Sequence, residues 1–215
     1  MKQKFPNHFF VTGIGTGVGK TITSAILTEA LACDYWKPIQ SGSVDETDRQ
    51  IVQSLTTNQQ SKFHPETYLL REPASPHFAA ALDVIEIELE KITLPQTENR
   101  LLIEGAGGLL VPINSELVIF DLIEYFNLPV IVVASNYLGS INHTLLTLQF
   151  LESQGATILG IIFSGKNYND NEQIIQHLSG VPVIGRIEET EHVNKAFVYQ
   201  QAIEIRQSLS EQFEL

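Results

Sequence analysis

A glycine-rich segment that ends in lysine and threonine is the first place in this sequence where chemistry is expected. It runs from Gly13 to Thr21 and reads GIGTGVGKT. Glycines let a backbone turn tightly and point several N–H groups inward, and a helix that starts here adds the positive end of its dipole. The ammonium of Lys20 can reach the β- and γ-phosphates of a nucleotide, and the Thr21 hydroxyl can bind Mg²⁺. The predicted nucleotide-binding residues of this loop are Gly15, Thr16, Gly17, Val18, Gly19, Lys20 and Thr21.

This loop is a variant of the Walker A pattern. The strict pattern places a glycine five residues before Gly19, whereas this sequence has Ile14 there and Gly13 one residue earlier. A dinucleotide-binding fingerprint is disfavoured because Val18 occupies the position of its third glycine. A glycine turn that binds nothing is disfavoured by the strand and helix expected on either side. We expect Lys20 to be a solvated loop lysine.

Two carboxylates and a second lysine could complete a site for phosphoryl transfer, which needs acidic side chains to hold Mg²⁺. Glu104 ends an apolar strand, where an unpaired carboxylate would be costly to bury; the alternative is a solvated glutamate at the strand end. Asp48 could bind metal or could be a helix N-terminal residue. Lys37 also ends a strand, and it could stabilise a phosphoryl group or be an ordinary exposed lysine.

The elements that must position these residues are predicted from short apolar runs, each followed by a turn and a helical pattern. Runs that are apolar on both faces and alternate with helices indicate a parallel sheet covered on both sides. We therefore expect an α/β fold of the P-loop NTPase type, with a mostly parallel sheet and helices on both faces. Strands are expected at residues 8–12, 35–37, 101–104, 130–134, 158–163 and 183–185, and helices at 21–32, 141–154 and 193–213.

Length and composition narrow the class of protein. A chain of 215 residues predicts one domain, residues 1–215, and 43% hydrophobic with 18% charged residues predicts an ordered core. A net charge of −12 argues against a nucleic-acid partner, and the single Cys33 excludes an intramolecular disulfide and a multi-cysteine zinc site. Apolar runs too short to span a bilayer, and a start without an apolar leader core, predict a cytoplasmic protein with no membrane partner.

Two further regions are predicted mainly to support the fold. The last helix should pack on the sheet through one apolar stripe. That stripe consists of Val198, Ala202, Ile205 and Leu209. Residues 56–95 are less regular and rich in proline and glutamine, so we expect either an insertion or a segment that covers a substrate.

Several motifs occur together in an order that is more specific than any one of them. The glycine loop is followed by KPIQSG at 37–42, EPASPH at 72–77, EGAGG at 104–108 and LGSINH at 138–143. Between about Phe9 and Gly185 this pattern closely resembles the ATP-dependent dethiobiotin synthetase family, which performs the penultimate step of biotin biosynthesis.

The resemblance implies a ligase that uses ATP and Mg²⁺ to join CO₂ to 7,8-diaminononanoate. One amine of the substrate takes up CO₂ as a carbamate, and a carbamate oxygen attacks the γ-phosphate to give a carbamic–phosphoric anhydride. The second amine then attacks the carbonyl, expels phosphate and closes the ureido ring. Because such a site must hold two anions together, it needs lysines and a metal rather than a nucleophile.

The resemblance also implies roles for particular residues of this sequence. Lys20 and Lys37 would neutralise the phosphates and the carbamate, and Thr16 and Ser41 would contact substrate or phosphoryl oxygens. The implied metal ligands are Thr21, Asp48 and Glu104. Further nucleotide contacts would come from Glu104, Gly107 and Ser164. The distant carboxylate of the substrate would be bound across the interface of a homodimer, at Gly139, Ser140, Ile141 and Asn142.

Two places depart from the family pattern, and two other classes of protein share the loop. Ser164 stands where many family members carry an asparagine that reads adenine, and residues 185–188 read GRIE, ending in Glu188, where the family pattern is GEIP. These departures leave the nucleotide preference open. A cobyrinate-type amidoligase is an alternative, although such enzymes usually need a glutaminase domain for which this chain is too short. A nucleotide-switched partitioning or regulatory ATPase is another, although these proteins usually carry an extra lysine early in the loop, and residues 13–15 contain none.

Overall fold

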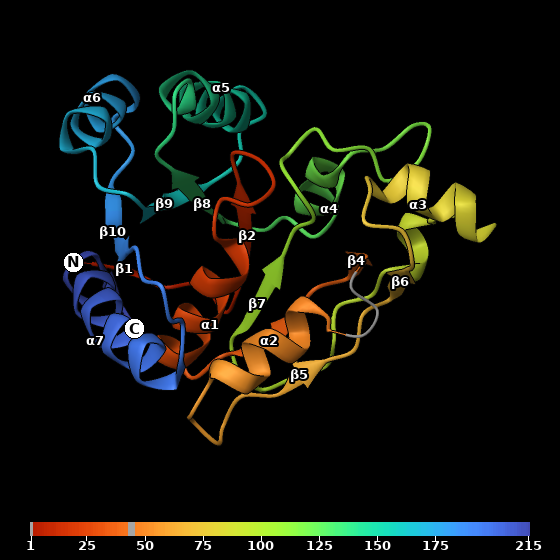
Figure 1. Ribbon diagram of the computed structural model, residues 1–215, viewed down its shortest axis with the longest axis horizontal. Helices are drawn as coiled ribbons and strands as arrows, with labels where there is room; N and C mark the ends of the chain where they lie inside the picture. The colour runs from red at the N-terminus through yellow and green to blue at the C-terminus, as the bar shows by residue number, and fades with distance from the viewer. Residues whose placement is uncertain (1, 43–45) are drawn as a thin grey trace.

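A seven-stranded parallel sheet forms the centre of the protein, whose computed structural model describes residues 2–42 and 46–215 (Figure 1). In spatial order the strands are β10 (Val183–Glu188), β9 (Ile158–Gly165), β8 (Val130–Ser135), β2 (His8–Gly13), β7 (Leu101–Glu104), β3 (Asp34–Trp36) and β5 (Phe63–His64). Each neighbouring pair of these strands is parallel. The expected α/β fold is therefore confirmed, and within this seven-stranded sheet β5 is the strand that the apolar runs did not predict.

Helices cover both faces of this sheet, as expected. One hydrophobic core joins the sheet to α1 (Lys20–Leu31), α2 (Asp48–Leu55) and α7 (Lys195–Gln212). The other core joins the opposite face to α3 (Pro76–Asp83), α4 (Ile119–Tyr125), α5 (Ser140–Ser153) and α6 (Asn169–Ser179). Successive residues of β2 enter different cores, since Phe9 and Val11 pack toward α1 whereas Phe10 packs on the other side. This alternation is why strands buried on both faces are apolar throughout.

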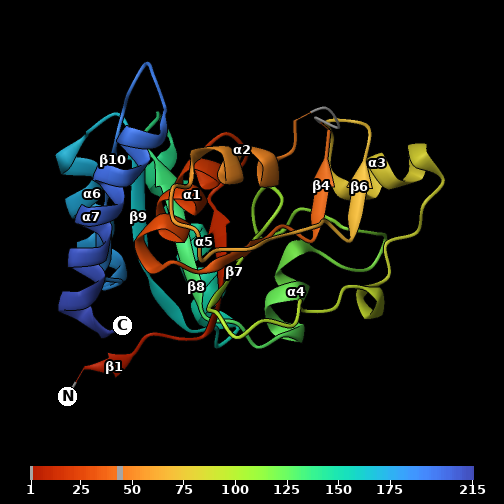
Figure 2. The same cartoon turned by 90° about the horizontal axis from the view of Figure 1, so that it is seen from below.

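The C-terminal helix packs through the predicted stripe and brings the two ends of the chain together. All four stripe residues of α7 are buried. After α7, the short strand β11 (Phe213–Glu214) pairs with β1 (Gln3–Lys4), so both termini lie at one end of the molecule (Figure 2). Phe5 is buried between the edges of two rings, with centroid distances of 5.2 Å to Phe9 and 5.3 Å to Phe213. No helix of the described residues is long and apolar enough to cross a membrane.

The irregular region 56–95 contains short elements that fold over the carboxyl edge of the sheet. Its strand β6 (Tyr68–Leu70) pairs in parallel with β4 (Ile39–Ser41), and helix α3 and a 3₁₀ turn at Leu89–Lys91 follow. Figure 2 shows β4, β6 and α3 together at one side of the central sheet. This arrangement sets the segment 73–76 across the cavity from the glycine loop.

A close backbone contact fixes the segment 73–76. Gly42 has a φ of +70°, and a Cβ built there would lie 2.7 Å from the Cα of Pro73. Its N–H donates to the carbonyl of Leu70 at 2.9 Å, so the turn after β4 is tied to the strand that leads into Pro73. A side chain at position 42 would therefore push the two backbones apart.

We expect Gly42→Ala to destabilise the protein by about 2–4 kcal/mol, because a backbone clash adds to the strain of a positive φ. Gly155→Ala is the matched control, since Gly155 has a φ of +71° with no atom within 4 Å of a built Cβ. That control should cost only about 1 kcal/mol. Urea unfolding of both variants measures the difference, and equal losses would show that the contact with Pro73 is unimportant.

Candidate active site

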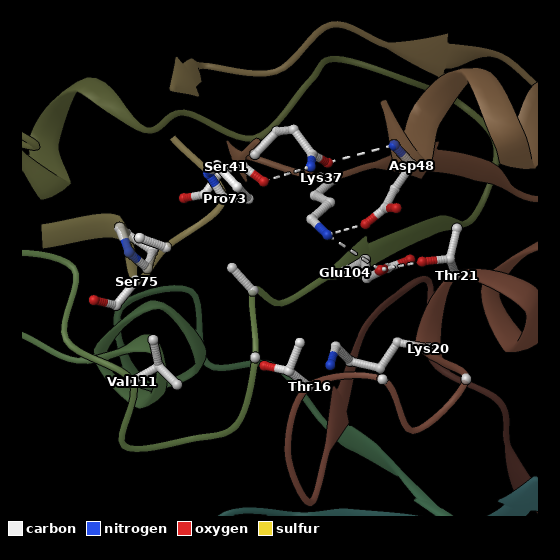
Figure 3. A pocket seen from close by; sticks show the side chains of 17 residues that line it. Thr16, Lys20, Thr21, Lys37, Ser41, Asp48, Pro73, Ser75, Glu104 and Val111 are labelled. Carbon is white, nitrogen blue, oxygen red and sulfur yellow. Dashed lines mark hydrogen bonds and ion pairs between the residues drawn. The ribbon is translucent and has the colours of Figure 1, made fainter. Parts of the chain in front are cut away.

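A cavity of about 650 Å³ lies at the carboxyl edge of the sheet, where strands β2, β7 and β3 end (Figure 3). Ligand sites of open α/β sheets gather at this edge. Ten residues predicted from the sequence line the cavity: Thr16, Gly17, Gly19, Lys20, Thr21, Lys37, Ser41, Asp48, Glu104 and Gly107. Residues far apart in the sequence therefore meet at one site.

The glycine loop leads into α1 without a side-chain cap. Gly19 is the N-cap residue with a φ of 95°, and because it has no side chain it makes no capping hydrogen bond with the first N–H groups of the helix. These groups and the helix dipole are therefore available to an anion, which is the arrangement that binds phosphate.

Lys20 is the first residue of α1 and is buried, so the expectation of a solvated loop lysine was wrong. Its side chain folds back over the loop, and Nζ donates to the carbonyl of Gly15 at 2.8 Å. Burial lowers the pKa of Lys20 to about 8; the carboxylates of Glu104 and Asp48 oppose this shift, and the positive charge of Lys37 adds to it. An ammonium that is poorly solvated in this way is well placed to bind phosphate.

Lys37 lies between the two predicted carboxylates (Figure 3). Its Nζ forms an ion pair with Asp48 and a second one with Glu104 Oε1 at 3.4 Å. Burial alone would lower the pKa of Lys37, but Glu104 and Asp48 together hold that pKa above its ordinary value. Because the residue is 6% exposed, the alternative of an ordinary exposed lysine is excluded.

Glu104 is also buried, at 1% exposure, which excludes a solvated glutamate at the strand end. Its Oε1 accepts from Thr21 Oγ1 at 3.4 Å and faces Lys37, and its Oε2 accepts from the hydroxyl of Tyr35 at 3.0 Å. Three donors thus offset the cost of burying the carboxylate. Burial, together with the nearby charges of Glu104 and Asp48, raises the pKa of Tyr35 well above its usual value, so the phenol remains a donor.

Asp48 is a helix N-terminal residue, one of the two roles that the sequence left open, and its carboxylate also faces the cavity. It is the first residue of α2, and the N-cap Thr47 forms a capping box with Gln50, in which Gln50 Oε1 accepts from Thr47 N at 2.7 Å. The same position turns the Asp48 carboxylate toward Lys37. Gln40 supports the start of the helix by accepting from the Asp48 N–H at 3.4 Å.

The oxygen atoms of this site fit a magnesium ion. Thr21, Asp48 and Glu104 offer one hydroxyl and two carboxylates, and Mg²⁺ prefers oxygen ligands completed by water and substrate phosphates. Residues 2–42 and 46–215 contain no group of three or more His, Cys, Asp or Glu that could form an all-protein metal cage. Ser41 Oγ is buried at the cavity and has no hydrogen-bond partner in the described part of the chain. Buried hydroxyls usually have a partner, so this one is available to a bound ligand.

The remaining predicted residues lie outside this cavity. Gly15 lines a neighbouring apolar cavity of about 340 Å³, whereas Val18 is buried in the core beneath the loop. Ser164 lies against the loop on the other side, since a Cβ built on Gly19 would come within 2.4 Å of its hydroxyl. The residues predicted to bind the distant carboxylate, Gly139, Ser140, Ile141 and Asn142, lie at the start of α5 and do not line the cavity of their own chain.

Several residues that shape the site were not predicted from the sequence. Tyr35 contacts Glu104, Gln40 lines the cavity, and Val111 and the segment 73–76 form its far wall. The EPASPH motif pointed to the segment 73–76, and the position of Tyr35 two residues before Lys37 on a strand could have placed both on one face.

Solved structures support the fold. The chain resembles a plasmid partition protein from Borrelia burgdorferi bound to AMPPNP, with a TM-score of 0.59 and 14% identity over 99% of this chain and 100% of the other. It also resembles the septum site-determining protein MinD with Mg-ADP from Pyrococcus horikoshii, with a TM-score of 0.54 and 13% identity over 95% and 96% of the two chains. At such low identity these similarities establish a P-loop NTPase-like fold alone.

Sequence relatives are far more similar. A family model described as an AAA domain matches residues 7–196. A protein of Christiangramia forsetii named ATP-dependent dethiobiotin synthetase BioD is 48% identical over 96% of this chain and 99% of its own length. The protein of the same name from Cytophaga hutchinsonii is 45% identical over 92% and 96% of the two chains. The resemblance inferred from the motifs is thereby confirmed, and the chain belongs to the ATP-dependent dethiobiotin synthetases, a family of cyclo-ligases.

Proposed function

We propose that this protein is a dethiobiotin synthase, which uses ATP, Mg²⁺ and CO₂ to close a ureido ring on 7,8-diaminononanoate. The observation that carries the proposal is the meeting of a phosphate-binding loop with two buried lysines and two carboxylates in one cavity. The near full-length similarity to proteins named dethiobiotin synthetase supplies the substrate class.

In the first step, one substrate amine adds to CO₂ and loses a proton, giving a carbamate. A carbamate oxygen then attacks the γ-phosphorus of ATP, the bond from that phosphorus to the bridging oxygen breaks, and ADP leaves. Lys20 and Lys37 oppose the charge that would otherwise hold the two anions apart. Thr16 and Ser41 contact substrate or phosphoryl oxygens from the two sides of the cavity.

Thr21, Asp48 and Glu104 would hold Mg²⁺, which when bound supplies positive charge beside the phosphate oxygens. Asp48 and Glu104 also keep Lys37 fully charged through their ion pairs. The same two carboxylates would thus contact both the ammonium of Lys37 and the Mg²⁺ ion.

In the second step, the remaining amine attacks the carbonyl of the mixed anhydride. The carbon–oxygen bond to the phosphoryl group breaks, phosphate leaves, the nitrogen loses a proton and the five-membered ring closes. The described lining of the cavity contains no cysteine or histidine, which suits a reaction driven by positioning and charge rather than by a protein nucleophile.

The far wall of the cavity suits the aliphatic part of the substrate. Pro73, Ala74, Pro76 and Val111 give that wall an apolar surface. We propose that the distant carboxylate of the substrate reaches the start of α5 in a second copy of the chain, so that the enzyme acts as a homodimer. We also propose that it is a cytoplasmic enzyme with no nucleic-acid or membrane partner. The uncapped N-terminus of α5, with Gly139 at a φ of 101°, is consistent with binding an anion.

A partitioning or regulatory ATPase remains the second candidate because solved proteins of that kind share the fold. Three observations favour the synthase. The sequence identity is 48% to a named dethiobiotin synthetase against 14% to the partition protein, residues 13–15 contain no lysine, and the cavity extends beyond the loop to a second wall. An amidoligase is disfavoured because relatives that are 45–48% identical over more than nine-tenths of this chain are named dethiobiotin synthetases.

Phosphate release from ATP tests the proposed function. We expect strong dependence on 7,8-diaminononanoate together with bicarbonate, and no stimulation by DNA or lipid vesicles.

Lys20→Ala should lower turnover by about 10²–10³, since it removes a charge that opposes the developing phosphoryl charge. Lys195→Ala, which changes an exposed lysine on α7, is the matched control. Substrate-independent release, or normal turnover by Lys20→Ala with an unchanged melting temperature, would refute the assignment.

The lowered pKa of Lys20 predicts how nucleotide affinity depends on pH. With a pKa of about 8 in the free protein, Lys20 is charged below that pH and loses its proton above it. Bound phosphate favours the charged form, so metal-free ATP affinity should fall by up to about tenfold per pH unit above about pH 8.

Calorimetry over this pH range measures the slope. Lys37 should not contribute, because its pKa is raised. Lys20→Arg is the matched variant, since a guanidinium remains charged throughout and should remove the decline in affinity. The same decline in both proteins would mean that another group titrates.

A further inference from the structure

Tyr35 is a buried residue of β3 whose contact with the active site is the hydrogen bond to Glu104. Its exposure is 0%, and it is absent from the described lining of the cavity. Its ring packs in the core beneath α1, and its hydroxyl donates to Glu104 Oε2 at 3.0 Å. A phenylalanine would fill the same apolar space, so the hydroxyl is the part of this side chain that packing does not explain.

The sheet register makes this contact possible. Trp36 of β3 pairs with Ile103 of β7, and Tyr35 pairs with Leu102. Because side chains alternate along a strand, Tyr35, Leu102 and Glu104 share the face that carries α1. Glu104 lies one diagonal step from Tyr35, a separation that a long aromatic side chain can span.

The two carboxylate oxygens of Glu104 contact two different residues of the same segment, Tyr35 and Lys37. Tyr35 holds Oε2 on the core side, whereas Lys37, two residues later, lies 3.4 Å from Oε1 on the cavity side. Thr21 Oγ1 also approaches Oε1, at 3.4 Å. The oxygen that faces the cavity is therefore Oε1, the one that the Tyr35 hydroxyl does not contact.

We propose that Tyr35 is a positioning residue for the magnesium site: its hydroxyl fixes the rotation of the Glu104 carboxylate so that Oε1 faces the cavity. This inference rests on the proposed function, in which Glu104 is a metal ligand. Without the phenol, Oε2 would be a buried charged acceptor with no donor, and the carboxylate would gain by turning both oxygens toward Lys37. Such a turn would add Oε2 to the contact that Lys37 already makes with Oε1 at 3.4 Å, and the lysine would then compete more strongly with the metal for this carboxylate.

Tyr35→Phe tests the proposal by removing one oxygen atom. ADP affinity is measured by calorimetry with and without Mg²⁺, and the ratio of the two affinities reports the contribution of the metal. We expect this ratio to fall by about tenfold in the variant, which is typical when a hydrogen bond to a metal ligand is lost. The affinity without Mg²⁺ should stay within about twofold of the parent, because Tyr35 does not line the cavity.

Tyr68→Phe is the matched control for the loss of a phenol. The Tyr68 hydroxyl accepts from Glu88 N at 3.0 Å and lies in β6, so its removal should lower the melting temperature without changing the Mg²⁺ ratio. A purely structural role for Tyr35 would produce that same pattern. Saturating ADP stabilises the folded protein, so Mg²⁺ can be titrated even into a destabilised variant.

A double-mutant cycle with Glu104→Gln shows whether Tyr35 acts through Glu104. We expect Glu104→Gln alone to reduce the Mg²⁺ ratio and Tyr35→Phe to cause little further change in that background. A parent-like ratio in Tyr35→Phe, or a full tenfold loss added to that of Glu104→Gln, would overturn the inference. A parent protein that binds no ADP in either condition would instead refute the proposed function.

Discussion

The burial of Lys37 between Asp48 and Glu104 is the interaction on which the site depends. A buried charge is tolerated when its partners are close. Here Asp48 is supplied by the start of α2, and Glu104 is supplied by the end of β7. With Lys20 included, the four side chains carry two positive and two negative charges, so the cavity can exist without a ligand. A triphosphate then enters a site that already contains cations, although the chain as a whole has a net charge of −12.

The parallel sheet is what allows such a cluster to form. Strands β2, β7 and β3 are neighbours that end at the same edge, and each ends at or leads directly into a residue or loop that lines the cavity. β2 leads into the glycine loop, β7 ends at Glu104, and β3 leads into Lys37. Since parallel strands are connected through helices that pack on the faces, the loops at this edge are free to carry chemistry while the core stays apolar.

Much of this could be predicted from the sequence, and the exceptions have a physical reason. The long apolar strands, α1, α5 and the stripe of α7 follow from local patterns and lie where expected. The burial of Lys37 could not be decided locally, because its partners lie 11 and 67 residues away. Lys20 was expected to be solvated, but its side chain folds back onto the loop that precedes it. The short strands β5 and β6 have too few residues for a pattern and form by pairing with β3 and β4, which lie far from them in the sequence.

The glycine loop and the second wall of the cavity contribute different kinds of information about function. The loop explains how a nucleotide is held, and proteins that share only 13–14% identity with this chain have the same fold around AMPPNP or Mg-ADP. It therefore says little about what receives the phosphoryl group. That information comes from the segments 37–42 and 73–76, which are joined by the β4–β6 pairing and by the contact of Gly42 with Pro73. These segments set Lys37, Ser41 and an apolar wall across the cavity from the glycine loop, which suits the proposed acceptor, anionic at one end and aliphatic along its length.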